Sequence, residues 1–302
     1  MNYDAVIVGG GPAGLAAALT LGRARKRVVL CDAGPRRNAA AVHVQNFVTR
    51  DGTPPAEFRR IAREQLQRYP NVEIRDVLAD AITGERGAFD VRLGADGVRA
   101  RRVLLCTGMV DELPAIDGFR ELWGTSIFAC PYCHGWEVQD RRFGMLATEP
   151  EMLTFAIFLR GWSRAVTVLT NGTLAIPSDV RAALKTAEVR IEERPIARLR
   201  ADGAHLAGVE FAEGDPVDLE VLFAHPVQRQ VDIVRALNLA LDDKGFVRVD
   251  DMRETSVPGI YVAGDLITPA QSAVLAAAAG MFAAAALNRA LTIELATSGG
   301  LG

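Results

Sequence analysis

The sequence has few cysteines, no excess of basic residues and no long uninterrupted apolar run. Four cysteines in 302 residues do not make the disulfide framework of a small secreted fold. A net charge of −3 argues against a nucleic-acid-binding surface, which needs clustered positive charge. The apolar stretch at 273–287 is shorter than the ~20 residues that cross a bilayer. We therefore expect a protein with no nucleic-acid partner and no membrane span.

The chain opens with Met1-Asn2-Tyr3-Asp4, which lacks the positive region of a secretory signal. Together with the cysteine usage, this predicts a cytoplasmic location. The length predicts about two domains. Apolar residues make up 49% and charged residues 24% of the chain, as in an ordinary globular protein.

A glycine-rich turn follows the first apolar run. Residues 9–14 read Gly-Gly-Gly-Pro-Ala-Gly, between an expected strand at 5–8 and an expected helix at 15–25. A second expected strand, 27–32, ends in Asp32. Glycines let a backbone turn approach a pyrophosphate at a helix N-terminus, and an acid after the second strand can bind a ribose hydroxyl. Although glycines also make ordinary turns, this context predicts a dinucleotide site built from Gly9, Gly11, Pro12, Ala13, Gly14 and Asp32.

Two cysteines lie close together in the sequence Cys130-Pro131-Tyr132-Cys133-His134. Such a pair can form a disulfide or a dithiol. A zinc site normally needs four ligands, and His43, His205 and His225 form no second close pair, so no metal is expected. The pKa range of histidine suits proton transfer to and from a thiolate, although His134 could also serve only for packing. The sequence predicts a redox pair, Cys130 and Cys133, with His134 as acid and base.

A second strand-helix-strand unit is expected at 143–147, 152–161 and 165–169. Its turn reads Ala147-Thr148-Glu149-Pro150-Glu151 in place of a glycine fingerprint, so two carboxylates would face the phosphates of a nicotinamide dinucleotide. Thr148 and Glu151 have the spacing of a capping box, which would satisfy the helix amides internally. Residues 170–172 offer no arginine for a 2′-phosphate. NADPH binding is therefore doubtful.

The C-terminal part is expected to contain strands at 245–249 and 259–263, then Gly264-Asp265 and an Ala-rich helix from near Ala270. A strand, a Gly-Asp pair and a helix in this order close the FAD site of many flavoproteins, although the same elements also occur without a ligand. Thr107-Gly108 ends another expected strand, 98–106, and is a second place where backbone could approach a cofactor.

With these features in place, the chain resembles the low-molecular-weight thioredoxin reductase family along nearly its whole length. The matching residues are Gly9 to Gly14, Asp32, Thr107-Gly108, the cysteine pair, and the stretch from Thr255 to Asp265. The resemblance implies an α/β fold with two Rossmann-like three-layer domains and a homodimer. Residues 1–112 and 243–302 would form the FAD domain, and 113–242 an inserted, smaller, NADPH-domain-like unit with the cysteines.

The resemblance also implies residue roles. Cys133 would lie against the flavin, Cys130 would exchange with the substrate, and His134 stands where the family commonly has an acidic Asp. Further cofactor contacts are implied for Asn46, Thr107, Gly108, Gly264, Asp265, Gln271 and Ser272. The family usually carries Arg-Gln where this chain has Gln271-Ser272.

The Cys-Pro-Tyr-Cys-His-Gly-Trp-Glu form and the missing nicotinamide fingerprint are similar to a subgroup that contains the dithiol oxidases of gliotoxin and holomycin biosynthesis. We therefore expect an FAD-dependent thiol-disulfide oxidoreductase that oxidises a dithiol without NADPH. Its partners would be a small-molecule dithiol or disulfide or a thioredoxin-like protein, with oxygen or another electron carrier as acceptor. The alternatives are an NADPH-dependent thioredoxin reductase and a non-catalytic flavin redox sensor.

Overall fold

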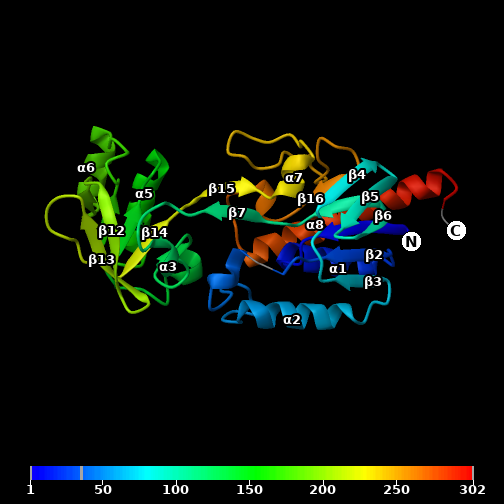
Figure 1. Ribbon diagram of the computed structural model, residues 1–302, viewed down its shortest axis with the longest axis horizontal. Coiled ribbons are helices and arrows are strands. Elements are labelled where there is room, and N and C mark those ends of the chain that lie inside the picture. Colours follow the sequence, from blue (N-terminus) through cyan, green and yellow to red (C-terminus); the bar gives the residue numbers. More distant parts are fainter. Residues whose placement is uncertain (1, 35–36, 301–302) are drawn as a thin grey trace. The chain divides into compact units, whose positions relative to one another are not determined.

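The computed structural model describes residues 2–34 and 37–300 and divides into two compact units (Figure 1). The first unit draws on Met1–Ala39, Asn46–Val110 and Gln228–Gly302. The second unit draws on Ala40–Gln45 and Asp111–Val227. The chain thus returns to the first unit at Gln228, earlier than the boundary expected at 243.

The first unit is built on a mixed sheet with the strand order β3-β2-β1-β6-β5-β4, and β16 also pairs with β6. β1 is parallel to β2 and β6, and β16 is parallel to β6, whereas β4, β5 and β6 form an antiparallel meander. The strands are β1 (Asn2–Val8), β2 (Val28–Cys31), β3 (Val72–Arg75), β4 (Ala81–Glu85), β5 (Ala88–Leu93), β6 (Asp96–Leu105) and β16 (Ile260–Val262).

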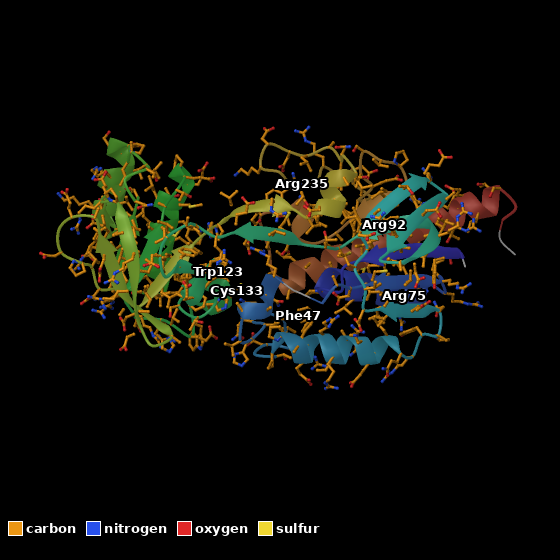
Figure 2. All side chains as sticks on the ribbon, in the orientation of Figure 1. Phe47, Arg75, Arg92, Trp123, Cys133 and Arg235 are labelled. Atoms are coloured by element: carbon orange, nitrogen blue, oxygen red, sulfur yellow. The ribbon has the colours of Figure 1, made fainter. Side chains whose placement is uncertain are left out.

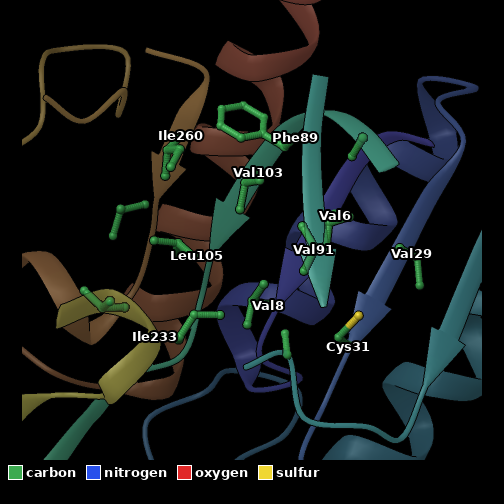
Figure 3. Packing of buried hydrophobic residues seen from close by; sticks show 14 of the residues in the cluster. Val6, Val8, Val29, Cys31, Phe89, Val91, Val103, Leu105, Ile233 and Ile260 are labelled. Atoms are coloured by element: carbon green, nitrogen blue, oxygen red, sulfur yellow. The ribbon is translucent and has the colours of Figure 1, made fainter. Parts of the chain in front are cut away.

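Both faces of this sheet are buried, because its central strands are continuously apolar and their consecutive side chains point to opposite faces. Val6, Val103 and Leu105 face one core with residues of β5 and α7 (Figure 3), while Ile7 and Leu104 face a second core under α1 and α8. The helices of this unit are η1 (Arg37–Ala40), α1 (Pro12–Arg23), α2 (Pro55–Leu66), α7 (Asp232–Ala236), η3 (Asp265–Ile267) and α8 (Ala273–Thr297).

Helix α8 is longer than the apolar stretch seen in the sequence. By length and composition alone, this helix of 25 residues could cross a membrane. However, Gly280, Ala283, Leu287 and Leu291 are buried, and a Cβ on Gly280 would lie 2.0 Å from the carbonyl oxygen of Ala13. α8 therefore packs tightly across α1 and acts as a core helix of the first unit.

The second unit contains a parallel sheet with the order β11-β10-β9-β14-β8 and an antiparallel hairpin, β12-β13. Its core lies on both faces of the parallel sheet, with Phe143 and Met145 of β9 on one face and Leu146 on the other. The strands are β8 (Ile127–Phe128), β9 (Phe143–Leu146), β10 (Val166–Leu169), β11 (Arg190–Glu192), β12 (Ile196–Asp202), β13 (His205–Phe211) and β14 (Val221–Ala224). The helices are α3 (Phe119–Leu122), α4 (Pro131–His134), α5 (Pro150–Phe158), η2 (Leu159–Gly161) and α6 (Ser178–Thr186).

Strands β7 (Met109–Glu112) and β15 (Val227–Gln230) pair with each other, and each contains a point where the chain passes between the units. The parallel sheets confirm the expected α/β fold class. The strand expected at 245–249 is wrong, since this segment makes only isolated bridges, Leu241 with Val247 and Val249 with Thr255. Turns at both ends shorten it, because the carboxylates of Asp242 and Asp250 accept hydrogen bonds from nearby backbone amides.

Candidate redox and cofactor-binding site

The redox pair lies at the start of the short helix α4 of the second unit, and Cys133 is labelled in Figure 2. Cys130 is the N-cap residue in extended conformation, and Pro131 occupies the first helical position, where its fixed φ favours a helix start. The backbone amide of Cys133 donates to the carbonyl of Cys130 at 3.2 Å, and that of Gly135 to Pro131 at 2.6 Å. Both cysteines are present as thiols, on one turn of the chain.

The surroundings of Cys130 favour its thiolate. A side-chain hydrogen bond with Cys133 is the main cause that lowers the pKa of Cys130 to about 7, and backbone amides of Cys133 and Tyr132 act in the same direction against burial. Cys31 and Cys106 differ sharply, since burial raises the pKa of Cys31 to about 12 and that of Cys106 still further. A cysteine reacts as its thiolate, so Cys130 is suited to thiol exchange at neutral pH, whereas Cys31 and Cys106 are unreactive core residues.

The imidazole of His134 lies face to face with Phe128, which ends β8. Burial is the main cause that lowers the pKa of His134, and the carboxylate of Glu137 and the backbone of Cys130 oppose it. Neither ring nitrogen has a hydrogen-bond partner in good geometry among the residues that the structure describes. His134 is therefore neutral at pH 7 and has a nitrogen able to accept a proton.

Aromatic side chains surround the same turn. The ring of Tyr132 lies 5.4 Å from that of Trp162, edge to face, and 5.8 Å from that of Phe158. Nε2 of His225 lies 2.7 Å from the carbonyl oxygen of Ala129, directly before Cys130. No sequence motif marks Phe128, Trp162 or His225, because their contacts with the α4 segment arise only from packing.

The glycine-rich turn of the first unit has the shape that a pyrophosphate needs. Gly9 has φ +109°, and a Cβ there would lie 2.3 Å from the carbonyl oxygen of Cys106. A Cβ on Gly14 would lie 1.8 Å from the carbonyl oxygen of Gly9. Gly11 is the N-cap of α1, and Pro12 and the buried Ala13 follow it in the first turn. No neighbouring atom would lie within 4 Å of a Cβ built on Gly11. The backbone around Gly11 is thus open at the helix N-terminus, and these residues fit a dinucleotide.

Asp32 is buried beside this turn. A Cβ on Gly10 would lie 2.2 Å from Oδ2 of Asp32. Oδ1 accepts a hydrogen bond from the amide of Gly34 at 3.0 Å, and the guanidinium of Arg59, from α2, pairs with the carboxylate. Arg59 was not predicted from the sequence, because it resembles an ordinary polar residue of an amphipathic helix.

The residues expected beside the flavin come from η3 and the start of α8. A Cβ on Gly264 would lie 3.1 Å from Cβ of Ala13. The carboxylate of Asp265 accepts a hydrogen bond from Arg37 at 3.1 Å, and Arg37 also donates to the side-chain oxygen of Gln271. Ser272 caps α8 by accepting a hydrogen bond from the amide of Leu275 at 3.2 Å. Arg37 was missed because its segment has no periodicity.

The remaining expected contacts are Thr107, Gly108 and Asn46. A Cβ on Gly9 would lie 3.0 Å from Cα of Thr107, so Thr107 borders the glycine-rich turn. Gly108 (φ +68°) and Asn46 (φ +59°) have left-handed backbones. The backbone amide of Asn46 donates to the carboxylate of Asp51 at 2.7 Å. The first unit thus brings the glycine-rich turn together with Asp32, Thr107 and Gly264, whereas Cys130, Cys133 and His134 belong to the second unit.

The corresponding turn of the second unit, between β9 and α5, has a different chemistry. Glu149 is the N-cap of α5, and its side chain makes no capping hydrogen bond. The expected capping box of Thr148 and Glu151 is wrong, since the hydroxyl of Thr148 lies 3.6 Å from the sulfur of Met152 instead. Pro150 at the first helical position moves the cap to Glu149. Both Glu149 and Glu151 are exposed at this helix start.

Comparisons with known proteins agree with this arrangement. The family model of pyridine nucleotide-disulphide oxidoreductases matches residues 3–281. A probable thioredoxin reductase of Arthroderma benhamiae is 33% identical over 300 residues, covering 87% of this chain and 74% of that protein.

Two solved structures are similar over almost the whole chain. The crystal structure of HlmI is 38% identical with a TM-score of 0.92, covering 99% of this chain and 95% of that one. An oxidoreductase from Agrobacterium tumefaciens is 37% identical with a TM-score of 0.91, covering 97% and 99%. These likenesses confirm the expected resemblance and the expected cofactor, FAD. The chain therefore belongs to the pyridine nucleotide-disulphide oxidoreductase family, as an FAD-dependent thiol-disulfide oxidoreductase of the thioredoxin reductase type.

Proposed function

We propose that this enzyme oxidises a dithiol to a disulfide through Cys130 and Cys133 and takes no electrons from NADPH. The observation that carries the proposal is the start of α5, where Glu149 and Glu151 occupy the turn that would bind the phosphates of a nicotinamide dinucleotide. A carboxylate ~4 Å from a phosphate charge opposes binding by about 4 kcal/mol at an effective dielectric of ~20. Two such contacts would disfavour NADPH strongly.

The cysteine pair supports the chemistry of dithiol oxidation. In the disulfide form, a substrate thiolate attacks the sulfur of Cys130, which forms a mixed disulfide and releases Cys133 as a thiolate. The second substrate thiol then attacks the substrate sulfur of this bond, which releases the product disulfide and Cys130. The backbone amides of Cys133 and Tyr132, which lower the pKa of Cys130, also stabilise its thiolate as the leaving group in this step.

His134 supports the same sequence of steps as the proton acceptor. Neutral at pH 7, it takes the proton of the second substrate thiol and makes the attacking thiolate. FAD, which the glycine-rich turn and Asp32 of the first unit would hold, would supply a two-electron acceptor for the reduced cysteine pair, with oxygen or another carrier as the final acceptor. Overall, two electrons and two protons leave the substrate.

An anaerobic titration of the FAD-loaded protein tests the direction of electron flow. Dithiothreitol is expected to bleach the flavin absorbance, and NADPH is expected to leave it unchanged. Prompt bleaching by NADPH would instead favour an NADPH-dependent thioredoxin reductase, which the name of the Arthroderma relative supports. A Cys133→Ser variant with full turnover would contradict both enzyme functions, because both act through Cys133. An unaltered protein that turns over neither a dithiol nor a disulfide would favour the non-catalytic flavin redox sensor.

We further propose a small-molecule substrate, a homodimer and a cytoplasmic location. Tyr132, 64% exposed between the two cysteines, offers an aromatic surface to an apolar dithiol. Exposed apolar side chains at helical spacing support self-association along α8: Val274, Leu275, Met281, Phe282 and Ile293. A cytoplasmic location is supported by the free cysteines Cys31 and Cys106, since unpaired cysteines are commoner in reducing compartments than in secreted proteins.

A further inference from the structure

We propose that Arg37 is a cofactor-binding residue, whose guanidinium neutralises Asp265 and binds an anionic group of FAD. Arg37 begins η1, in a segment that carries no recognisable motif. Its side chain reaches two residues from the far end of the chain, Asp265 and Gln271. The proposal depends on the binding of FAD and is independent of the direction of electron flow.

The contacts of Arg37 are held in place by a hydrogen-bonded network. Nη1 lies 3.1 Å from Oδ2 of Asp265 and also donates to Oε1 of Gln271. The side-chain nitrogen Nε2 of Gln271 donates to the backbone carbonyls of Asp265 at 3.3 Å and Thr268 at 3.2 Å. Gln228 exchanges hydrogen bonds of 3.0 and 2.9 Å with Gln271. The amide oxygen of Gln271 is therefore directed at Arg37.

This network borders the place where the pyrophosphate fits. Gly264, directly before Asp265, would bring a Cβ within 3.1 Å of Ala13 in the first turn of α1. A Cβ on Gly280 of α8 would lie closer still to Ala13, 2.0 Å from its carbonyl oxygen. Gln271 lies directly before Ser272, the N-cap of α8. Arg37 thus lies at the junction of the glycine-rich turn, η3 and the start of α8.

Charge explains why an arginine is needed at this junction. The carboxylate of Asp265 is only 22% exposed, so water screens it weakly, and it would repel the phosphates of FAD. The Arg37 guanidinium, 26% exposed, cancels this charge. Guanidinium groups bind carboxylates and phosphates alike, so Arg37 can bridge Asp265 to the cofactor. Arg59 is paired with Asp32 in the same way, which places one arginine on each of the two acids expected to contact FAD.

Substitution of Arg37 tests the proposal through FAD affinity. We expect Arg37→Gln to weaken FAD binding by about ten- to a hundred-fold, the range for loss of a charge-assisted hydrogen bond. Arg37→Lys is expected to lose less FAD affinity than Arg37→Gln, because lysine keeps the positive charge. Affinity is measured as the fluorescence of FAD released when the loaded protein is diluted, with neither substrate nor NADPH present. Arg248→Gln, which removes the same charge from an exposed position of the first unit, is the control.

A relocated arginine separates charge from local folding. In the double variant Arg37→Gln with Gln271→Arg, the cation returns to the same junction from the start of α8, and we expect most of the lost affinity to return. The proposal is overturned if Arg37→Gln holds FAD as tightly as the unaltered protein or loses no more than Arg248→Gln. It is also overturned if neither the lysine nor the relocated arginine regains affinity, because Arg37 would then act only by ordering its own segment.

Discussion

The imidazole of His134 and the ring of Phe128 are stacked, with centroids 4.2 Å apart and planes inclined by 12°. Phe128 ends β8, the edge strand that pairs with β14 in the parallel sheet of the second unit. The ring is therefore held by the sheet, and it holds the imidazole beside the cysteine turn. One side chain thus links the core of the second unit to the group expected to move protons.

Replacement of Phe128 by leucine should loosen His134 while the core stays apolar. Because burial lowers the pKa of His134, loss of the ring should raise that pKa toward its ordinary value. We expect the acid limb of the pH profile for flavin reduction by a dithiol to move to higher pH, with a several-fold lower rate. The cost in stability should be about 1 kcal/mol. Phe143→Leu, in the same core but away from His134, is the control, and equal effects in both variants would contradict the prediction.

The reactivity of the reduced cysteine pair should report the pKa of Cys130. Iodoacetamide attacks the thiolate, so alkylation of Cys130 should be slow below pH 7, rise through a midpoint of about 7 and level off above it. In Cys133→Ala the midpoint should move upward, because the hydrogen bond that contributes most to the lowering is removed. Mass spectrometry locates the label, with Cys31 and Cys106 as unlabelled internal controls. An unchanged midpoint in Cys133→Ala would show that another group activates Cys130.

Two glycines of the same turn should respond differently to alanine. Gly9→Ala should destabilise the FAD-free fold by at least ~2 kcal/mol, because Gly9 has a left-handed backbone and its Cβ would overlap the carbonyl of Cys106. Gly11→Ala should leave the free energy of unfolding within ~1 kcal/mol, since its φ is −77° and its Cβ meets no atom.

Nevertheless, Gly11→Ala should weaken FAD binding at least ~10-fold, because the added methyl group occupies the approach of the pyrophosphate. Chemical unfolding without FAD and FAD release from the loaded protein are the two measurements. If Gly11→Ala bound FAD normally, the pyrophosphate would not approach this turn as closely as we expect.

A charge placed on α8 should dissociate the proposed homodimer. Met281 is 50% exposed and is one of the exposed apolar side chains of α8, so Met281→Glu should shift the molecular mass in solution from dimer to monomer. Light scattering after size-exclusion chromatography measures this shift. Glu121→Lys, an exposed charge change on α3 of the second unit, is the control. A Met281→Glu dimer of unchanged stability would place the interface elsewhere.

Features that depend on local residue order could be predicted from the sequence. The glycine-rich turn and the cysteine pair were found because their chemistry needs fixed residue types at fixed spacing. The partners Arg37, Arg59 and Phe128 were not found, because each contacts the site from a distant segment and an arginine or phenylalanine is ordinary in such positions. The capping box of Thr148 and Glu151 failed because Pro150 moved the helix start by one residue.

Strand β16 pairs with a strand that lies far from it in the sequence. It comprises residues 260–262, yet it lies beside β6, with Ile260 opposite Val103 and Val262 opposite Leu105. During synthesis, β1 and β6 therefore emerge from the ribosome long before the strand and the helix that cover them. Contacts so far apart in sequence slow folding, because the intervening chain must first close into a loop. The apolar edge of β6 stays exposed until then, so chains truncated before β16 should depend on chaperones or aggregate.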